Sequence, residues 1–141
     1  MNHQDGIRRT IAQYMHGIDD KDVEKTTQTF AQNGHLVARG EAVTGHAAIS
    51  AFLHTLWDGT PPDRKTKHLH TATVINVNGD TADAVSDVTI FACAAGIPWA
   101  LRMTNRHHDK LVLEDGVWKL SEKQVKEVTG FSLRSFKSPR E

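Results

Sequence analysis

The segment from Trp99 to Leu120 carries an imidazole and a carboxylate, His107 and Asp109, within a pattern typical of a β-hairpin. Side chains alternate across a strand, so both groups point the same way as a mainly apolar row of residues: Leu101, Met103, Asn105 and Leu111. If this row faces a core, each polar group must be hydrogen-bonded or shifted in pKa. We expect Asp109 to fix the tautomer of His107 and raise its basicity, which gives a proton-transfer pair. The alternative is a strand end in solvent.

A second pair of imidazoles, His68 and His70, shares one face of a β-rich run. With His107 or Asp109 as a third ligand, these histidines would fit a metal site. The rest of the chain has no ligand-like spacing, so we predict no metal and no cofactor. We expect His68 to face a cavity as general base or acid, and His70 to be structural or at the rim.

The first helix carries Tyr14 and Asp19. Tyr14 lies on an apolar stripe, either as a core residue or as a hydrogen-bond donor to a developing oxyanion or leaving hydroxyl. Asp19 either caps the helix or turns inward to orient a histidine or hold a substrate hydroxyl. Five residues correspond to about 500° of helical rotation, so both side chains reach one pocket only if the helix has unwound by Asp19.

Several further residues are candidates for contacts with a substrate. They either pack as plain core or form a flat apolar wall for an aromatic or polycyclic ligand, and they are Trp57, Phe91, Trp99 and Met103. Asp87 lies in the strand before the hairpin, on a face that the pattern leaves undecided. We include it among the possible substrate-binding residues.

The length and composition of the chain limit the classes of protein to which it can belong. The chain has 141 residues, 38% hydrophobic content and a formal net charge of zero, which fits one globular domain with a small-molecule substrate. The cationic residues are scattered, so we expect no nucleic-acid partner and no membrane partner. The single cysteine, Cys93, and the lack of a signal-peptide pattern or of a long apolar run favour a cytoplasmic protein.

Hydrophobic periodicity places helices first and strands after them. We expect helices over residues 7–18, over 23–30 with an end at Asn33-Gly34, and over 48–57, with a short strand at 36–39. β-rich runs follow from Lys67 to Val77 and on to Cys93, and then the hairpin turns at Asp115-Gly116. This order predicts an α+β fold in which a strongly curved sheet wraps the helices and encloses an apolar pocket.

Several segments resemble SnoaL-like proteins of the nuclear transport factor 2-like (NTF2-like) superfamily. They are Tyr14-Met-His-Gly-Ile-Asp19, Gly40-Glu-Ala-Val-Thr-Gly45, Lys67-His68-Leu69, Arg106-His-His-Asp109 and Asp115-Gly-Val-Trp118. The resemblance implies a cone-shaped pocket and a homodimer formed through the sheet. It also implies that Tyr14, Asp19 and His68 line the cavity, because they match the positions used by dehydratases of the superfamily.

Two departures from the family pattern bear on the reaction. Relatives often carry tyrosine where this chain has His107. The segment that aligns with the general base of ketosteroid isomerase, near Ala38-Arg39, has no carboxylate, which argues against that mechanism in its usual form.

Our sequence-based hypothesis is a cofactor-free acid–base lyase or isomerase, dehydratase-like, for a small hydrophobic molecule with a hydroxyl or carbonyl group. His68, helped by Asp19, would remove a proton, and Tyr14 with the His107–Asp109 pair would protonate the leaving oxygen or stabilise an enolate. One alternative is a non-catalytic ligand-binding or accessory subunit, and another is a metal-dependent enzyme. We expect one domain over 1–128 and a loosely held tail over 129–141.

Overall fold

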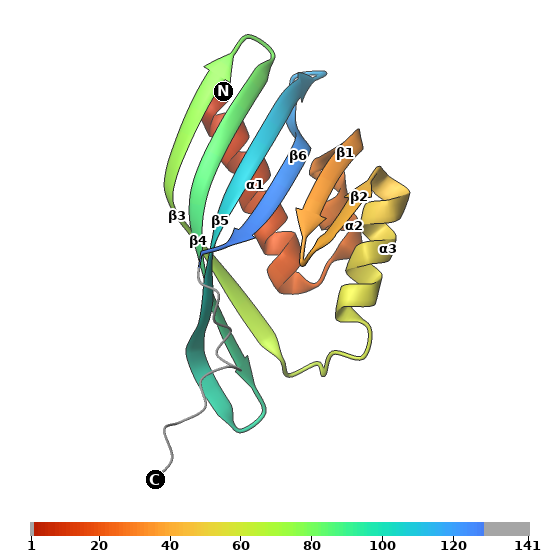
Figure 1. The fold of residues 1–141 in the computed structure, drawn as a ribbon, viewed down its shortest axis with the longest axis vertical. Coiled ribbons are helices and arrows are strands. Elements are labelled where there is room, and N and C mark those ends of the chain that lie inside the picture. The colour runs from red at the N-terminus through yellow and green to blue at the C-terminus, as the bar shows by residue number, and fades with distance from the viewer. Residues whose placement is uncertain (1, 129–141) are drawn as a thin grey trace.

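Figure 1 shows the computed structural model, which describes residues 2–128, and the expected tail at 129–141 lies outside the described residues. Three helices lie on one side of a single sheet in this part of the chain (Figure 1). The helices are α1 (His3–Asp20), α2 (Val23–Gln28) and α3 (His46–Trp57). The strands are β1 (Phe30–Ala38), β2 (Glu41–Thr44), β3 (Lys65–Asn78), β4 (Thr81–Ala94), β5 (Ile97–Glu114) and β6 (Val117–Glu127).

The sheet is mixed, with strand order β2-β1-β6-β5-β4-β3. β1 runs parallel to β6, and every other neighbouring pair is antiparallel. The turn between β5 and β6 has positive φ at both Asp115 (51°) and Gly116 (78°), as a two-residue hairpin turn requires. The α+β fold class predicted from periodicity is therefore confirmed. Within residues 2–128, every helix is too short or too polar to cross a membrane.

Helix α1 is stabilised by capping residues at both ends and by an apolar face that packs against the core. The Asn2 side chain accepts the Asp5 backbone N–H at 2.8 Å, and Lys21 ends the helix in a left-handed conformation. One face buries Ile7, Ile11 and Tyr14, among others. The helix continues through Asp19 and Asp20, so the unwinding considered from the sequence does not occur.

The predicted end of the second helix is wrong. α2 ends at Gln28, and Phe30 begins strand β1, where it pairs with Leu120 of β6. The strand runs through Gly34, and a Cβ on that glycine would lie only 2.9 Å from the Phe30 side chain. The segment 23–34 therefore has local helical spacing, but the pairing of Phe30 with β6 decides its conformation.

The inner face of β5 follows the predicted row from Met103 onward. Asn105, His107, Asp109 and Leu111 are all buried, which confirms that this face packs against the core. Leu101 instead is 48% exposed, because the β4–β5 register shifts between Ile90 and Phe91. The His107–Asp109 pair thus lies inside the fold, and the alternative of a strand end in solvent is wrong.

Candidate functional site

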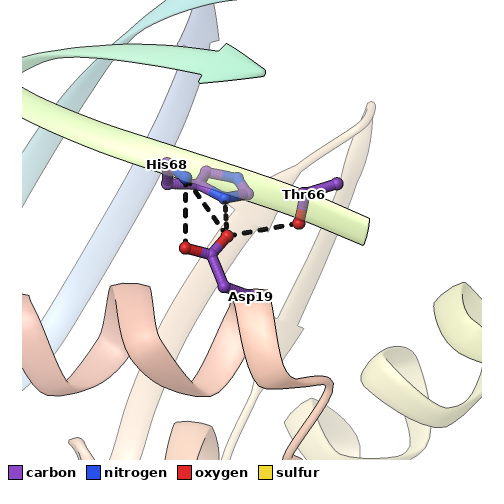
Figure 2. A network of polar contacts seen from close by, with 3 residues as sticks. All are labelled: Asp19, Thr66 and His68. Carbon is purple, nitrogen blue, oxygen red and sulfur yellow. Dashed lines mark hydrogen bonds and ion pairs between the residues drawn. The ribbon is translucent and has the colours of Figure 1, made fainter. Parts of the chain in front are cut away.

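The last turn of α1 is tied to β3 by a hydrogen-bonded pair, Asp19 and His68, which we call the dyad (Figure 2). The Asp19 Oδ1 atom lies 2.5 Å from His68 Nδ1. The same carboxylate accepts the His68 backbone N–H at 3.1 and 3.2 Å and the Thr66 hydroxyl at 3.2 Å. The side chains of Asp19 and His68 are 10% and 12% exposed, so the dyad is largely buried but still meets solvent.

The dyad fixes which nitrogen of His68 is free. A carboxylate only accepts hydrogen bonds, so the proton between the two side chains is on Nδ1 and the lone pair of neutral His68 is on Nε2. Burial favours a higher pKa for Asp19, but the hydrogen bonds from the His68 ring and backbone and from Thr66 outweigh it and hold the pKa below its usual value. Asp19 is therefore ionised at neutral pH and orients the His68 ring through Nδ1, which leaves Nε2 as the nitrogen that can accept a proton.

A second group of polar residues lies deeper and consists of Tyr14, His107, Asp109 and Lys123, which we call the interior cluster. Lys123 Nζ lies 2.8 Å from Asp109 Oδ1 and 3.1 Å from His107 Nδ1. It also lies 4.4 Å from the centroid of the Tyr14 ring, within range for a cation–π contact. The side chains of Lys123 and Asp109 are both 0% exposed, so the ion pair is wholly enclosed by protein.

Burial dominates the electrostatics of the interior cluster. It raises the pKa of Tyr14, and the nearby Asp109 charge adds to that shift. It lowers the pKa of His107 to about 2, and the Lys123 charge acts in the same direction. The expectation that Asp109 raises the basicity of His107 is therefore wrong. The Asp109 carboxylate pairs with the Lys123 ammonium, and the same ammonium contacts His107 Nδ1.

Several buried polar atoms in this region lack a hydrogen-bond partner among residues 2–128. They include His107 Nε2, Asn105 Oδ1, Ser86 Oγ and His70 Nε2. Ser86 is paired with His107 across β4 and β5, and Asn105 is the next residue on the same face of β5. Because buried polar groups are normally satisfied, this patch of the inner face is suited to binding a polar ligand group or water.

Lys123 is the member of the site that the sequence did not reveal. Trp118 and Leu120 are buried on β6, so simple alternation would bury residue 122 and expose 123. The β5–β6 pairing instead passes from Leu111–Leu120 to Lys110–Glu122, which leaves Ser121 as an extra residue. This β-bulge shifts the phase of the strand and turns Lys123 inward.

The remaining predicted residues lie in different surroundings. Trp57 and Met103 are partly buried against the core. Asp87 is on the opposite face from buried Ser86 and Val88, and its Oδ1 accepts the Arg106 Nε–H at 2.8 Å. The side chain of Asp87 is 41% exposed, so it does not join the interior residues.

Two aromatic candidates are also separated from the cluster. Phe91 follows buried Ile90 on β4 and lies on the outer face with partial exposure, and Trp99 is 52% exposed near the start of β5. His70 is partly buried on β3, its Nδ1 is 3.1 Å from the Thr73 hydroxyl, and burial lowers its pKa. Within residues 2–128, no three or more His, Cys, Asp or Glu side chains are grouped so that they could hold a metal ion.

Two surface hollows lie away from these groups. One of about 450 Å³ is bordered by residues 2–5, Arg8 and Val77, and one of about 500 Å³ lies between α1, the end of α2 and the β5–β6 turn. Neither hollow is lined by the dyad or by His107, Asp109 or Lys123. The enclosed apolar pocket implied by the family resemblance stays a prediction.

Comparison with known proteins agrees with this architecture. The family model of the SnoaL-like domain matches residues 1–124, so the chain belongs to the SnoaL-like family, with an NTF2-like, cystatin-like fold. None of the curated proteins matches the sequence.

Solved structures from bacteria are similar in fold. An NTF2-like protein from Novosphingobium aromaticivorans has 22% identity and a TM-score of 0.75, over 91% of this chain and 83% of its own. A protein of unknown function from Nostoc punctiforme has 20% identity and a TM-score of 0.77, over 91% and 92%. A third, from N. aromaticivorans and proposed to be a scytalone dehydratase, has 22% identity and a TM-score of 0.76, over 89% and 84%.

Proposed function

We propose that this protein is a cofactor-independent acid–base lyase or isomerase of the dehydratase type. Its substrate is a small hydrophobic molecule that carries a carbonyl group and a hydroxyl group. The observation that carries the proposal is the dyad: an ionised carboxylate 2.5 Å from His68 Nδ1, which leaves His68 Nε2 without a hydrogen bond to any of residues 2–128. A structural neighbour proposed to be a scytalone dehydratase supports the reaction class.

The chemistry follows from the free nitrogen. His68 Nε2 takes a proton from the carbon next to the substrate carbonyl, and Asp19 stabilises the imidazolium that forms. The electron pair moves onto the carbonyl oxygen as an enolate. When the enolate collapses, the bond from the β-carbon to its hydroxyl breaks, and the proton on His68 returns to the departing oxygen as water. General acid–base assistance of this kind contributes about 10²–10⁴-fold.

The test uses a bicyclic β-hydroxy ketone in D₂O. Loss of water is followed by absorbance, and deuterium uptake at the α-carbon is followed by mass spectrometry. We expect His68→Asn to reduce both rates by about 10²–10⁴-fold, with a smaller loss for Asp19→Asn. Matched controls are His16→Asn and Asp20→Asn, since both residues are exposed on the same helix, and these variants should keep wild-type rates. Full turnover by His68→Asn would contradict the proposal.

The second candidate is ligand binding without catalysis. It is favoured by the enclosed Lys123–Asp109 pair and the unpartnered atoms beside it, which could hold a polar ligand with no proton transfer. Binding of the ketone by calorimetry, with neither water loss nor deuterium uptake by the wild-type protein, would support this candidate over the enzyme.

A further inference from the structure

The hydrogen bond between Lys123 and His107 fixes the tautomer of a buried imidazole. Lys123 Nζ is 2.8 Å from the Asp109 carboxylate, in an enclosed ion pair whose cation is the lysine ammonium. An ammonium has only donors and no lone pair. The contact of 3.1 Å to His107 Nδ1 is therefore a donation from lysine to the ring, and Nδ1 must be unprotonated.

The proton of His107 then resides on Nε2. A neutral imidazole has one N–H and one acceptor nitrogen, so an accepting Nδ1 leaves Nε2–H as a donor. Double protonation would place an N–H against the ammonium in a dry environment, and the lowered pKa of His107 agrees with a neutral ring. His107 is 2% exposed, and its Nε2 has no partner among residues 2–128. A buried donor of this kind requires a partner that the chain itself does not supply.

We propose that His107 is a catalytic hydrogen-bond donor, whose neutral Nε2–H binds the carbonyl oxygen of the substrate and the enolate oxygen formed from it. Lys123 and Asp109 are positioning residues that hold this tautomer. The inference rests on the proposed function and narrows it: the substrate must present a carbonyl oxygen to the inner face of β5. No proton leaves His107 in this step, because the proton taken from carbon goes to His68.

The charges around His107 come from several elements. Lys123 lies on β6, His68 and His70 on β3, Asp109 and His108 on β5, and Tyr14 on α1. Asp109 supplies the anion that Lys123 pairs with, and Lys123 and the three neighbouring histidines disfavour a positive His107. A neutral donor is suited to an oxygen that gains negative charge in the transition state, since it stabilises the charge without releasing its proton.

The direct test is nitrogen NMR of the full chain without substrate. Long-range ¹H–¹⁵N spectra distinguish the two tautomers and the imidazolium, and His107→Gln assigns the signals. We expect the neutral Nε2–H form from about pH 5 to about pH 8. Detection of Nδ1–H or of the imidazolium in this range would overturn the inference. Because no turnover is involved, this result is independent of whether the protein proves to be an enzyme.

A second test separates hydrogen-bond donation from proton transfer. Glutamine retains an N–H donor but cannot titrate, whereas leucine offers neither. With the ketone as probe, we expect kcat of His107→Leu to fall about 10²–10³-fold and that of His107→Gln to stay within about tenfold of wild type, with little change in KM. Equal loss in both variants would overturn the donor role. Loss in both His68→Asn and His107→Leu, with His107→Gln retained, supports the two proposals together.

Discussion

The dyad and the interior cluster each contain a histidine beside a charged partner, yet the partners have opposite sign. His68 faces the carboxylate of Asp19, so its Nδ1 carries the proton and its Nε2 can accept one. His107 faces the ammonium of Lys123, so its Nδ1 accepts and its Nε2 carries the proton. The charge placed next to Nδ1 thus determines whether Nε2 of the same side chain is an acceptor, as in His68, or an N–H donor, as in His107.

The two regions also differ in how much the stability of the fold depends on each charged group keeping its partner. The dyad keeps some contact with solvent, so either group can be hydrated if its partner is lost. Lys123 and Asp109 have no such contact, and removal of one leaves the other as a buried, uncompensated charge. Stability measurements can therefore separate the regions without a substrate.

The largest effect is expected at Lys123. Lys123→Met retains the length of the side chain but strands the Asp109 carboxylate, and we expect it to lower the free energy of unfolding by about 3–5 kcal/mol. Urea denaturation at neutral pH gives this value. The double variant Lys123→Met/Asp109→Asn removes both charges and should recover most of the loss. If the single variant cost less than about 1 kcal/mol, the pair would not be the enclosed interaction described above.

An intermediate effect is expected from the pH dependence at His107. Its pKa is lowered in the folded protein, whereas the unfolded chain binds a proton near pH 6.5. The stability from neutral His107 is complete above that pH and declines as the pH falls toward the folded-state pKa of about 2, by at most about 1.4 kcal/mol per pH unit.

His107→Gln removes this one titration. Urea denaturation between about pH 4 and pH 7.5 should give a shallower slope for the variant than for wild type. The lowered pKa of His70 contributes with the same sign to both proteins, so it does not affect the difference. Identical slopes would mean that His107 is as easily protonated in the folded state as in the unfolded chain.

The smallest effect is expected at Asp19. Asp19→Asn keeps an acceptor oxygen but loses the charge, and we expect a loss of about 1 kcal/mol at neutral pH. Because the folded-state pKa of Asp19 is lowered, this contribution is present above the unfolded pKa of about 3.9 and disappears as the pH falls through the folded value. The difference between variant and wild type in thermal unfolding should therefore vanish in acid. Asp20→Asn, at an exposed neighbouring site, should show no such convergence.

Long amphipathic helices and strands could be predicted from the sequence because their buried apolar residues repeat with the period of a helix or of a strand. The stripe of α1 and the row from Met103 to Leu111 on β5 belong to this group. The turn at Asp115-Gly116 was predictable because few residues adopt its positive φ angles. Candidate chemistry at Tyr14, Asp19, His68, His107 and Asp109 also came from residue type and from the family resemblance.

Contacts that depend on irregular pairing could not be predicted in the same way. The bulge at Ser121 turns Lys123 inward, and no local signal marks it. Without Lys123, the sequence predicts a raised pKa for His107, whereas burial and the Lys123 charge lower it. Helical spacing also predicts that α1 must unwind before Tyr14 and Asp19 can reach one pocket. In the structure each residue contacts a different strand, Tyr14 near Lys123 of β6 and Asp19 at His68 of β3, so no unwinding is needed.

The pairing of Asp109 with Lys123 across β5 and β6 also has a consequence for folding fidelity. In the native register these two residues are direct partners. A slip of the hairpin by one residue would set Asp109 opposite Glu122 or Gln124 and leave the ammonium without its carboxylate. The same slip would also turn the buried hydrophobic side chains of one strand to the opposite face of the sheet, so hydrophobic burial and the enclosed charge pair both favour the native register. The ion pair therefore disfavours shifted pairings of β5 with β6 and helps to specify the native register of this hairpin.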